Sequence, residues 1–282
     1  SLAGKMITDV DEMISHLGLQ NTISPEQGAM QSTIAGVDPD FKMPQVWKSS
    51  LALDYQMPTS FPFTVTVEGI FTKNLNDVML INYDIKEPDN TWQRFNGPDD
   101  RYIYPAREDI RYNDVDAYVL SNNNEGWGAI GNITATAEPV QNLDLMASYT
   151  FTESKEITGM PGSNASSAYG GLVTVNGPHL PNLERSQYVV PHRAIASLTY
   201  RVPWNNSKVL SNTTFNLFYT GYTFSGYSYT YTNDINGDGW GSTDLIYIPE
   251  KKGDIRFVSS EDEDAFFAFM DQDKYLKANK GG

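Results

Sequence analysis

The chain lacks cysteine and has only three histidines among its 282 residues. The absence of cysteine excludes disulfides, thiolate metal sites and cysteine nucleophiles. Basic residues are also few, 20 against 35 acidic ones, and the formal net charge of −15 argues against a nucleic-acid partner. No run of apolar residues approaches the ~18 that a membrane-spanning helix needs. Transmembrane strands escape this test, because their alternating pattern gives a much weaker hydropathy signal.

What the sequence has instead is alternation of apolar and polar residues. Phe63, Val65 and Val67 fall on one face of an extended chain, with threonines between them on the other face. Several such segments reach the roughly 9–11 residues that a tilted strand needs to cross a bilayer. Aromatic residues gather near the segment ends, as interfacial girdles do. The alternation predicts strands at about residues 46–56, 62–74, 125–138, 142–153, 191–202 and 212–230.

The connections between these strands alternate in length. The short ones are residues 57–61, 138–141 and 203–208, and the long ones are 75–124, 154–190 and the segment after Thr230. Outer-membrane barrels sort their connections in this way, with short periplasmic turns and long outer loops. The sequence therefore predicts an all-β fold of antiparallel up-and-down strands from a transmembrane β-barrel. The alternative is a secreted, soluble β-sandwich whose aromatics fill its core and bind carbohydrate with calcium support.

Two flanking segments carry helix signals. Thr8 to Asp11 resembles a capping box that opens a short helix ending near Leu17. Ser260 with Glu263 predicts the start of a second helix, whose apolar stripe consists of Phe266, Phe269, Met270 and Tyr275. We interpret both as helices within long outer loops. Helices that bind a partner protein are the alternative.

The segment from Asp234 to Gly239 has the front half of a calcium loop. Asp234, Asn236 and Asp238 supply oxygens at alternate positions, and a glycine permits the sharp turn that follows. A complete loop would place a carboxylate at its twelfth position, but Asp244 arrives one residue early. The sequence predicts a weak calcium site formed by Asp234, Asn236, Asp238 and Asp244. The alternative is a turn whose side chains bond their own backbone.

Residues suited to catalysis are scattered. His16, His179 and His192 lie far apart, and the sequence has neither a serine nucleophile elbow nor a two-histidine zinc helix. His192 stands at the start of a predicted strand, where a structural hydrogen bond is expected. Acidic pairs such as Asp99–Asp100 are typical of solvated loops. We therefore expect no enzyme and no catalytic residue.

A series of short motifs adds a second line of inference. In chain order they are Pro44-Gln45-Val46-Trp47-Lys48, Leu53-Asp54-Tyr55, Phe71-Thr72-Lys73-Asn74, Ser186-Gln187-Tyr188, Pro191-His192-Arg193, Phe218-Tyr219-Thr220-Gly221, Asp234-Ile235-Asn236-Gly237-Asp238-Gly239 and Asp244-Leu245-Ile246-Tyr247-Ile248-Pro249. In order and spacing these motifs resemble the barrel of TonB-dependent receptors, specifically the Oar-like branch. The resemblance runs from about residue 22 to the C-terminus.

The resemblance implies a large, 22-stranded barrel in the cell outer membrane with an N-terminal plug. It implies uptake of a nutrient (a peptide, a glycan or a metal chelate) that is powered by the TonB complex acting through the plug region. Outer-membrane lipid would be the other partner. The sequence shows no plug, TonB box, signal peptide or aromatic-ended terminal strand. We therefore expect residues 1–282 to be an internal part of the barrel domain, with strands in about 44–230 and an outer loop with a short helix in 231–282.

Overall fold

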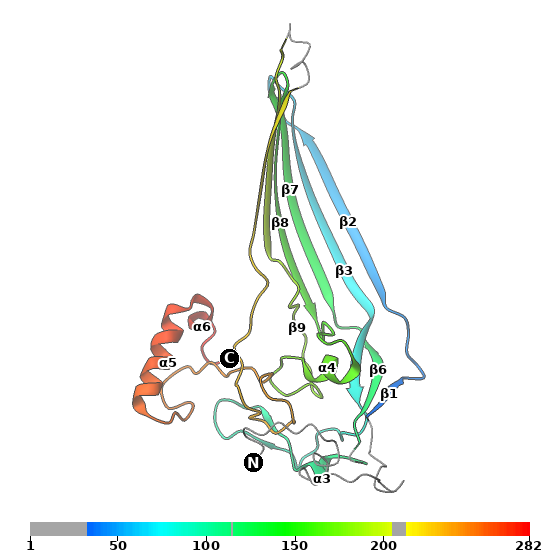
Figure 1. Ribbon diagram of the computed structural model, residues 1–282, viewed down its shortest axis with the longest axis vertical. Coiled ribbons are helices and arrows are strands. Elements are labelled where there is room, and N and C mark those ends of the chain that lie inside the picture. Colours follow the sequence, from blue (N-terminus) through cyan, green and yellow to red (C-terminus); the bar gives the residue numbers. More distant parts are fainter. Residues whose placement is uncertain (1–32, 114, 205–212) are drawn as a thin grey trace, which may run out of the picture.

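The strand-rich part of the chain forms one open antiparallel sheet. The computed structural model describes residues 33–113, 115–204 and 213–282. The sheet contains, in spatial order, β2 (Gln45–Gln56), β3 (Phe63–Asn82), β7 (Trp127–Val140), β8 (Leu143–Glu156), β10 (His192–Arg201) and β11 (Thr214–Tyr222). Short connections meet at one end of the sheet and long ones gather at the other (Figure 1). The predicted all-β fold and its up-and-down strand order are confirmed.

Two strand boundaries differ from the prediction. β11 ends at Tyr222 and not near residue 230, because its neighbour β10 begins at His192 and offers no backbone partner beyond this point. β3 is longer than predicted and runs to Asn82. Its outer half pairs with β6 (Ala117–Asn123), which pairs in turn with the parallel strand β1 (Ile34–Val37). The segment 75–124 was predicted as a loop, but it contributes strands to this outer extension of the sheet.

The remaining elements lie in the long loops. They are β4 (Gln93–Arg94) and β5 (Tyr102–Ile103), which pair with each other, β9 (Glu184–Arg185) beside β8, and the helices α3 (Arg107–Ile110), α4 (Ala165–Gly170), α5 (Ser260–Gln272) and α6 (Lys274–Ala278). None of the helices in the described part of the chain is long and apolar enough to cross a membrane. The capping box predicted from Thr8 lies outside the described residues.

The helix predicted from Ser260 is present as α5. Its N-cap is Ser259, one residue earlier than predicted, whose hydroxyl accepts a hydrogen bond from the Asp262 N–H at 3.1 Å. Met270 is fully buried and packs with Ile248 of the same loop. These contacts support the interpretation of α5 as a helix that folds onto its own loop. Two members of the predicted apolar stripe, Phe269 and Tyr275, remain exposed.

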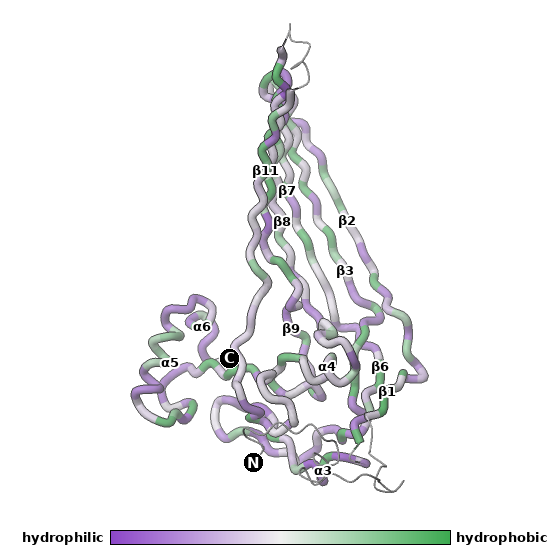
Figure 2. The backbone as a smooth tube through the Cα atoms, viewed as in Figure 1, coloured by the Kyte–Doolittle hydropathy of each residue, from purple (hydrophilic) through white to green (hydrophobic). Residues whose placement is uncertain are grey.

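The sheet has one apolar and one polar face. Paired residues share a face, and the register aligns Leu53, Val67, Ile133 and Tyr149 in a single row across four strands. Figure 2 shows the resulting alternation of hydropathy along β2 and β3. The opposite face carries rows of threonine, serine and asparagine. A barrel strand alternates in this way between lipid and lumen.

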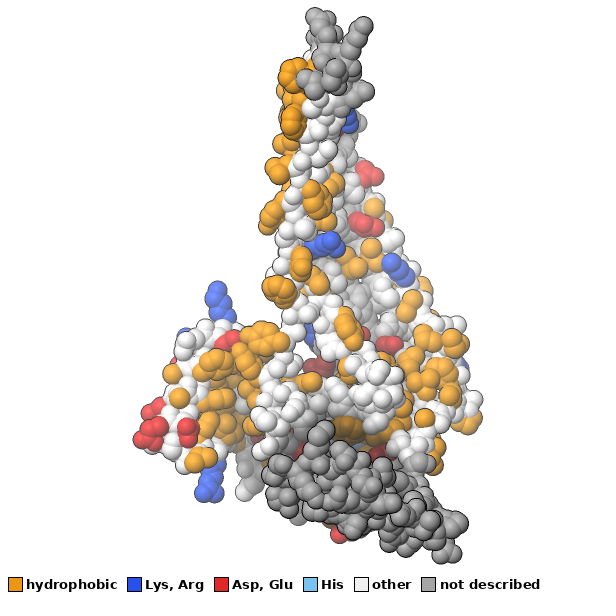
Figure 3. Space-filling view, in the orientation of Figure 1, with side chains coloured by type: hydrophobic (Ala, Val, Ile, Leu, Met, Phe, Trp, Pro, Cys, Tyr) orange, Lys and Arg blue, Asp and Glu red, His pale blue; other side chains and the backbone are white. Residues whose placement is uncertain are grey.

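The apolar face is open to its surroundings. Leu51 is 81% exposed, Leu217 is 68% exposed, and Ile133 in the middle of the sheet is 47% exposed. Hydrophobic side chains are visible along the strand region in Figure 3. A soluble sandwich would cover such a face with a second sheet, and the described residues contain none in that position. The sandwich alternative is therefore inconsistent with the structure.

Aromatic residues mark both ends of the apolar face. Near the long loops, the rings of Trp47 and Phe71 pack edge-on with centroids 6.2 Å apart, and the rings of Phe151 and His192 lie 5.4 Å apart. Near the short turns, the rings of Phe61 and Phe63 stack with their centroids 6.3 Å apart. Phe63 and Phe71 are eight residues apart on β3, or about 26 Å along the strand. At the ~35–45° tilt of barrel strands, this length spans about 20 Å along the membrane normal, most of the ~25 Å apolar band of an outer-membrane barrel.

Candidate functional site: a junction of three outer loops

The loop from Tyr83 to Gly126 is organised by a buried polar cluster that consists of Asn82, Asp84, Arg111 and Asp116. Asp84 accepts backbone N–H bonds from Asn113 at 2.7 Å and from residue 115 at 3.1 Å. Arg111 bridges Asp84 at 3.3 Å and Asp116 at 2.5 Å. The Asn82 side chain bonds Asp116 at 2.9 Å. This cluster fixes both ends of the loop to the outer end of β3.

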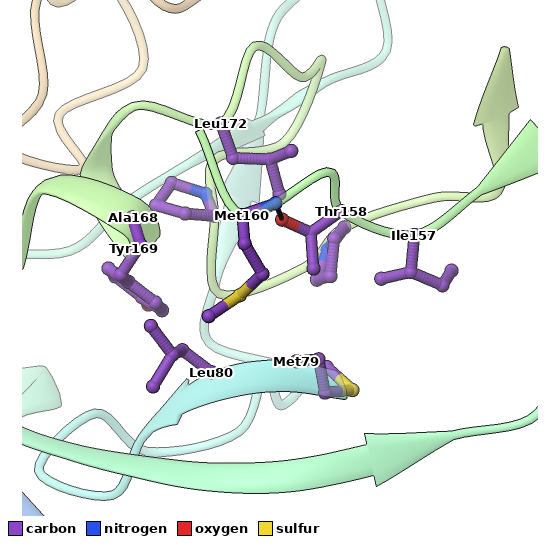
Figure 4. Close-up of a pocket in the computed structure, with 10 residues that line it drawn as sticks. Met79, Leu80, Ile157, Thr158, Met160, Ala168, Tyr169 and Leu172 are labelled. Carbon is purple, nitrogen blue, oxygen red and sulfur yellow. Dashed lines mark hydrogen bonds between the residues drawn. The ribbon is translucent and has the colours of Figure 1, made fainter. Parts of the chain in front are cut away.

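The loop 157–191 packs on the same part of β3. Leu80 lies in a cluster with Tyr118 and with Tyr169 of α4, and the two tyrosine rings are 5.1 Å apart. Figure 4 shows Met160 between Leu80 and Thr158 beside this contact. The crevice there holds only about 10 Å³, enough for a single water molecule. The contact is therefore a packing interface and not a ligand pocket.

The third loop, 223–282, contributes the turn Asp234–Asp244. Asp234 accepts N–H bonds from Gly237 at 2.7 Å and from Gly239 at 2.8 Å, one on each carboxylate oxygen. The Asn236 side chain accepts the Asp238 N–H at 2.9 Å. These bonds match the alternative to a calcium loop, a turn in which side chains of the motif bond their own backbone. They set the shape of the turn.

The Asp234–Asp244 turn connects all three loops, and we call this region the outer-loop junction. The Tyr104 N–H of the first loop donates to the Asn236 carbonyl at 2.7 Å. Thr174 of the second loop forms a parallel bridge with Asp244. Trp240 packs directly on Gly170, where any side chain would collide with the indole ring. The junction therefore depends on contacts between segments more than 50 residues apart in the sequence.

The junction buries negative charge. Burial raises the pKa of Asp238 to about 7, although the Trp240 N–H opposes this shift; the Asp244 and Asp234 carboxylates raise it further. Burial also raises the pKa of Asp244, against the Ile235 N–H that it accepts at 3.0 Å. Oδ2 of Asp238 and Oδ1 of Asp244 are buried and have no hydrogen-bond partner within the described residues.

The comparisons with known proteins bear on the strands and the first two outer loops, because the matched segment ends just before the Asp234–Asp244 turn. The family model described as "Outer membrane beta barrel domain" matches residues 8–233, about four fifths of the chain. This chain belongs to that family of outer-membrane β-barrel domains. The match places the protein in the outer membrane, where one face of its sheet would meet lipid and the other the lumen. Searches of curated proteins and of solved structures gave no match.

In this barrel domain the predicted calcium ligands occupy one turn, but they are not equivalent. Asp234 and Asn236 use their side-chain oxygens on backbone N–H groups, whereas Asp238 and Asp244 each keep one free oxygen. Within the described residues, no three His, Cys, Asp or Glu side chains converge closely enough to hold a metal by themselves. Calcium binding stays a prediction.

The sequence analysis missed two contributors to the junction of this barrel. Thr174 is 3% exposed and Tyr104 is 6% exposed, and each meets the Asp234–Asp244 turn from another loop. Neither stands in a motif, and only the folded chain brings them to the turn. Asp244, the least certain of the four predicted ligands, is the most buried carboxylate of the set at 1% exposure.

In metal-free solution, the outer-loop junction should lose stability as the pH rises. Asp238 has a pKa of about 7 in the fold against 3.8 ordinarily, so between these values the folded junction holds a proton that the unfolded chain has released. Stability should be greatest below pH ~4 and fall toward pH ~7 by up to ~1.4 kcal/mol per pH unit. Hydrogen exchange around Trp240, corrected for intrinsic rates, measures this slope. Asp238→Asn should flatten it, and an unchanged slope in that variant would contradict the assignment.

Proposed function

We propose that the chain forms part of a TonB-dependent receptor that takes up a nutrient (a peptide, a glycan or a metal chelate) across the outer membrane. The observation that carries the proposal is the outer-loop junction. Its three long loops are packed into one ordered unit at the outer end of the strands, which suits capture and gating of a ligand more than passive diffusion. The ordered series of motifs that resembles these receptors supports the same function.

The polar face of the sheet provides a surface suited to such a ligand. Asn132 donates to Thr150 at 2.8 Å, and Thr134 lies 2.8 Å from the Ser148 hydroxyl. Toward the short turns, Arg201 pairs with Asp144 at 2.8 Å. These neutral and paired groups would line a hydrophilic path without strong selection for one sign of charge.

The described sheet also supports a place within a larger barrel. It has six long strands in its main order, and β2 and β11 each pair with only one of them. A closed membrane barrel needs at least about eight strands, because every strand edge in lipid must be paired. We propose that further strands complete the barrel and that the energy for uptake comes from the TonB complex through a plug region. No step of the proposal requires chemistry by this chain.

Uptake measurements in cells that produce the protein test this proposal. The probes are a labelled hexapeptide, a labelled oligosaccharide and a ferric chelate, each too large for passive pores. We expect uptake of one of them to disappear both when the protein is deleted and when TonB is removed. Uptake that depends on the protein but survives the loss of TonB would contradict the energised mechanism. If none of the three probes depended on the protein, the uptake function itself would be wrong.

A further inference from the structure

We propose that the outer-loop junction binds one hard divalent cation of the calcium class through Asp238 Oδ2, Asp244 Oδ1 and Thr174 Oγ1. This inference stands on the geometry of the junction and does not depend on the uptake function. It differs from a calcium loop that Asp234 and Asn236 would coordinate. In this site the ligands come from two different outer loops.

The first observation is that polar atoms are buried there without partners. The three oxygens named above have no hydrogen-bond partner within the described residues. Asp244 and Thr174 are 1% and 3% exposed, so bulk solvent does not reach these side chains. A buried oxygen without a hydrogen-bond partner lowers the stability of the fold by roughly 1–3 kcal/mol, and by more if the oxygen is charged. Two carboxylate oxygens and a hydroxyl are the ligand types that calcium prefers.

The second observation is that these groups belong to two segments, 174–177 and 238–244, that contact each other. Thr174 and Asp244 are bridge partners in parallel strands, so their side chains project to the same side. The other carboxylate oxygen of Asp244 accepts the Ile235 N–H at 3.0 Å, which directs the group into the Asp234–Asp244 turn. Oδ2 of Asp238 lies next to Gly177, three residues after Thr174, in space that a Cβ atom would fill.

The third observation is a shortage of positive charge. Arg101 is the buried cation whose field reaches Asp244 and opposes the rise of its pKa. Its Nε, however, is bonded to both carboxylate oxygens of Asp99, at 2.9 and 3.0 Å. Asp99 therefore balances the charge of Arg101, whereas the carboxylates of Asp234, Asp238 and Asp244 lie close enough to interact unfavourably. A divalent cation would neutralise most of this charge.

Bound there, the cation would act as a clamp between loops. Thr174 belongs to the loop after β8, and both carboxylates belong to the loop after β11. Occupancy would hold these loops together at the calcium concentrations found outside cells. Sites of this kind on extracellular modules have dissociation constants of about 0.1–1 mM.

Terbium luminescence in detergent micelles tests the site, because Tb³⁺ is also a hard, oxygen-seeking cation. The backbone N–H of Trp240 donates to Asp238 Oδ1 at 2.7 Å, so this tryptophan belongs to the same turn and its indole can sensitise a bound ion. We expect saturable emission that calcium displaces at about 0.1–1 mM. Asp244→Asn and the near-isosteric Thr174→Val should each weaken binding by about tenfold or more. Asp109→Asn, which removes an exposed carboxylate of α3, should bind like the unaltered chain.

Two results would overturn the proposal. One is the absence of both sensitised emission and binding heat up to about 5 mM calcium, above the range of extracellular sites. The other is unchanged affinity in Thr174→Val, because this variant removes only the hydroxyl and keeps the backbone bridge. If Asp244→Asn fails to fold, Thr174→Val alone decides between these outcomes. Equal weakening by Asp109→Asn would show attraction to net negative charge and would also reject the site.

Discussion

Replacing Ile133 by lysine should lower the free energy of unfolding in a bilayer by about 2–4 kcal/mol, the cost of a lysine at mid-membrane on the lipid face of a barrel. Ile133 stands halfway between the two aromatic ends of the apolar face and is 47% exposed. Its paired neighbours are Val67 and Tyr149. No carboxylate shares this row to compensate the charge.

Thr136→Lys is the matched control. Thr136 lies on the same strand three residues away, and it faces the polar side of the sheet with Thr64 and Met146 as its paired neighbours. A lysine there would remain in the lumen, so the expected cost is below about 1 kcal/mol. Urea titration of both variants in lipid vesicles measures the difference. A larger cost for Thr136→Lys would mean that the two faces have been assigned the wrong way round, and equal costs would mean that neither face meets lipid in the way proposed.

The second large effect is expected at the buried polar cluster of the first outer loop. Asp84→Ala should destabilise the loop 83–126 by about 3–5 kcal/mol, as the loss of one partner from a buried ion pair does. The Asp84 side chain is 1% exposed, and its removal would leave Arg111 with one carboxylate partner fewer. Two backbone N–H groups would also lose their acceptor.

Limited proteolysis and hydrogen exchange of the loop 83–126 measure this change. The strands in the bilayer should keep their protection, because the polar cluster lies beyond the apolar band. Asp109→Ala removes the same charge from an exposed position in α3 and should leave the loop protected. If Asp84→Ala left the loop as resistant as the unaltered chain, the cluster would not be what holds the loop in place.

The strands were predictable from the sequence because their signal is local. Alternation such as that of Phe63, Val65 and Val67 follows directly from the two environments on either side of a barrel wall. The alternation of short and long connections then indicated that these strands belong to a transmembrane β-barrel. The predicted strand boundaries were wrong where pairing decides the length of a strand. At Tyr222, for example, β11 ends because β10 offers no further backbone partner.

The interior of the outer loops could not be predicted in the same way. Asn82 meets Asp116 across 34 residues, and Lys42 meets Asn122 across 80 residues. Polar pairs of this kind leave no period in the sequence. The Asp234–Asp244 motif was visible, but Thr174, which pairs with Asp244, belongs to another loop. The sequence thus identified the turn, and the fold identifies what surrounds it.

The central claim is that this chain crosses the outer membrane with its long loops outside and its short turns in the periplasm. Because the chain has no cysteine, a single introduced cysteine reports on its side of the membrane without background. Ser163 is exposed in the second outer loop, and Ser60 is exposed in the turn between β2 and β3. With a membrane-impermeant maleimide, Ser163→Cys should be labelled on intact cells, and Ser60→Cys only after the outer membrane is opened. Labelling of Ser60→Cys and not of Ser163→Cys on intact cells would contradict the account.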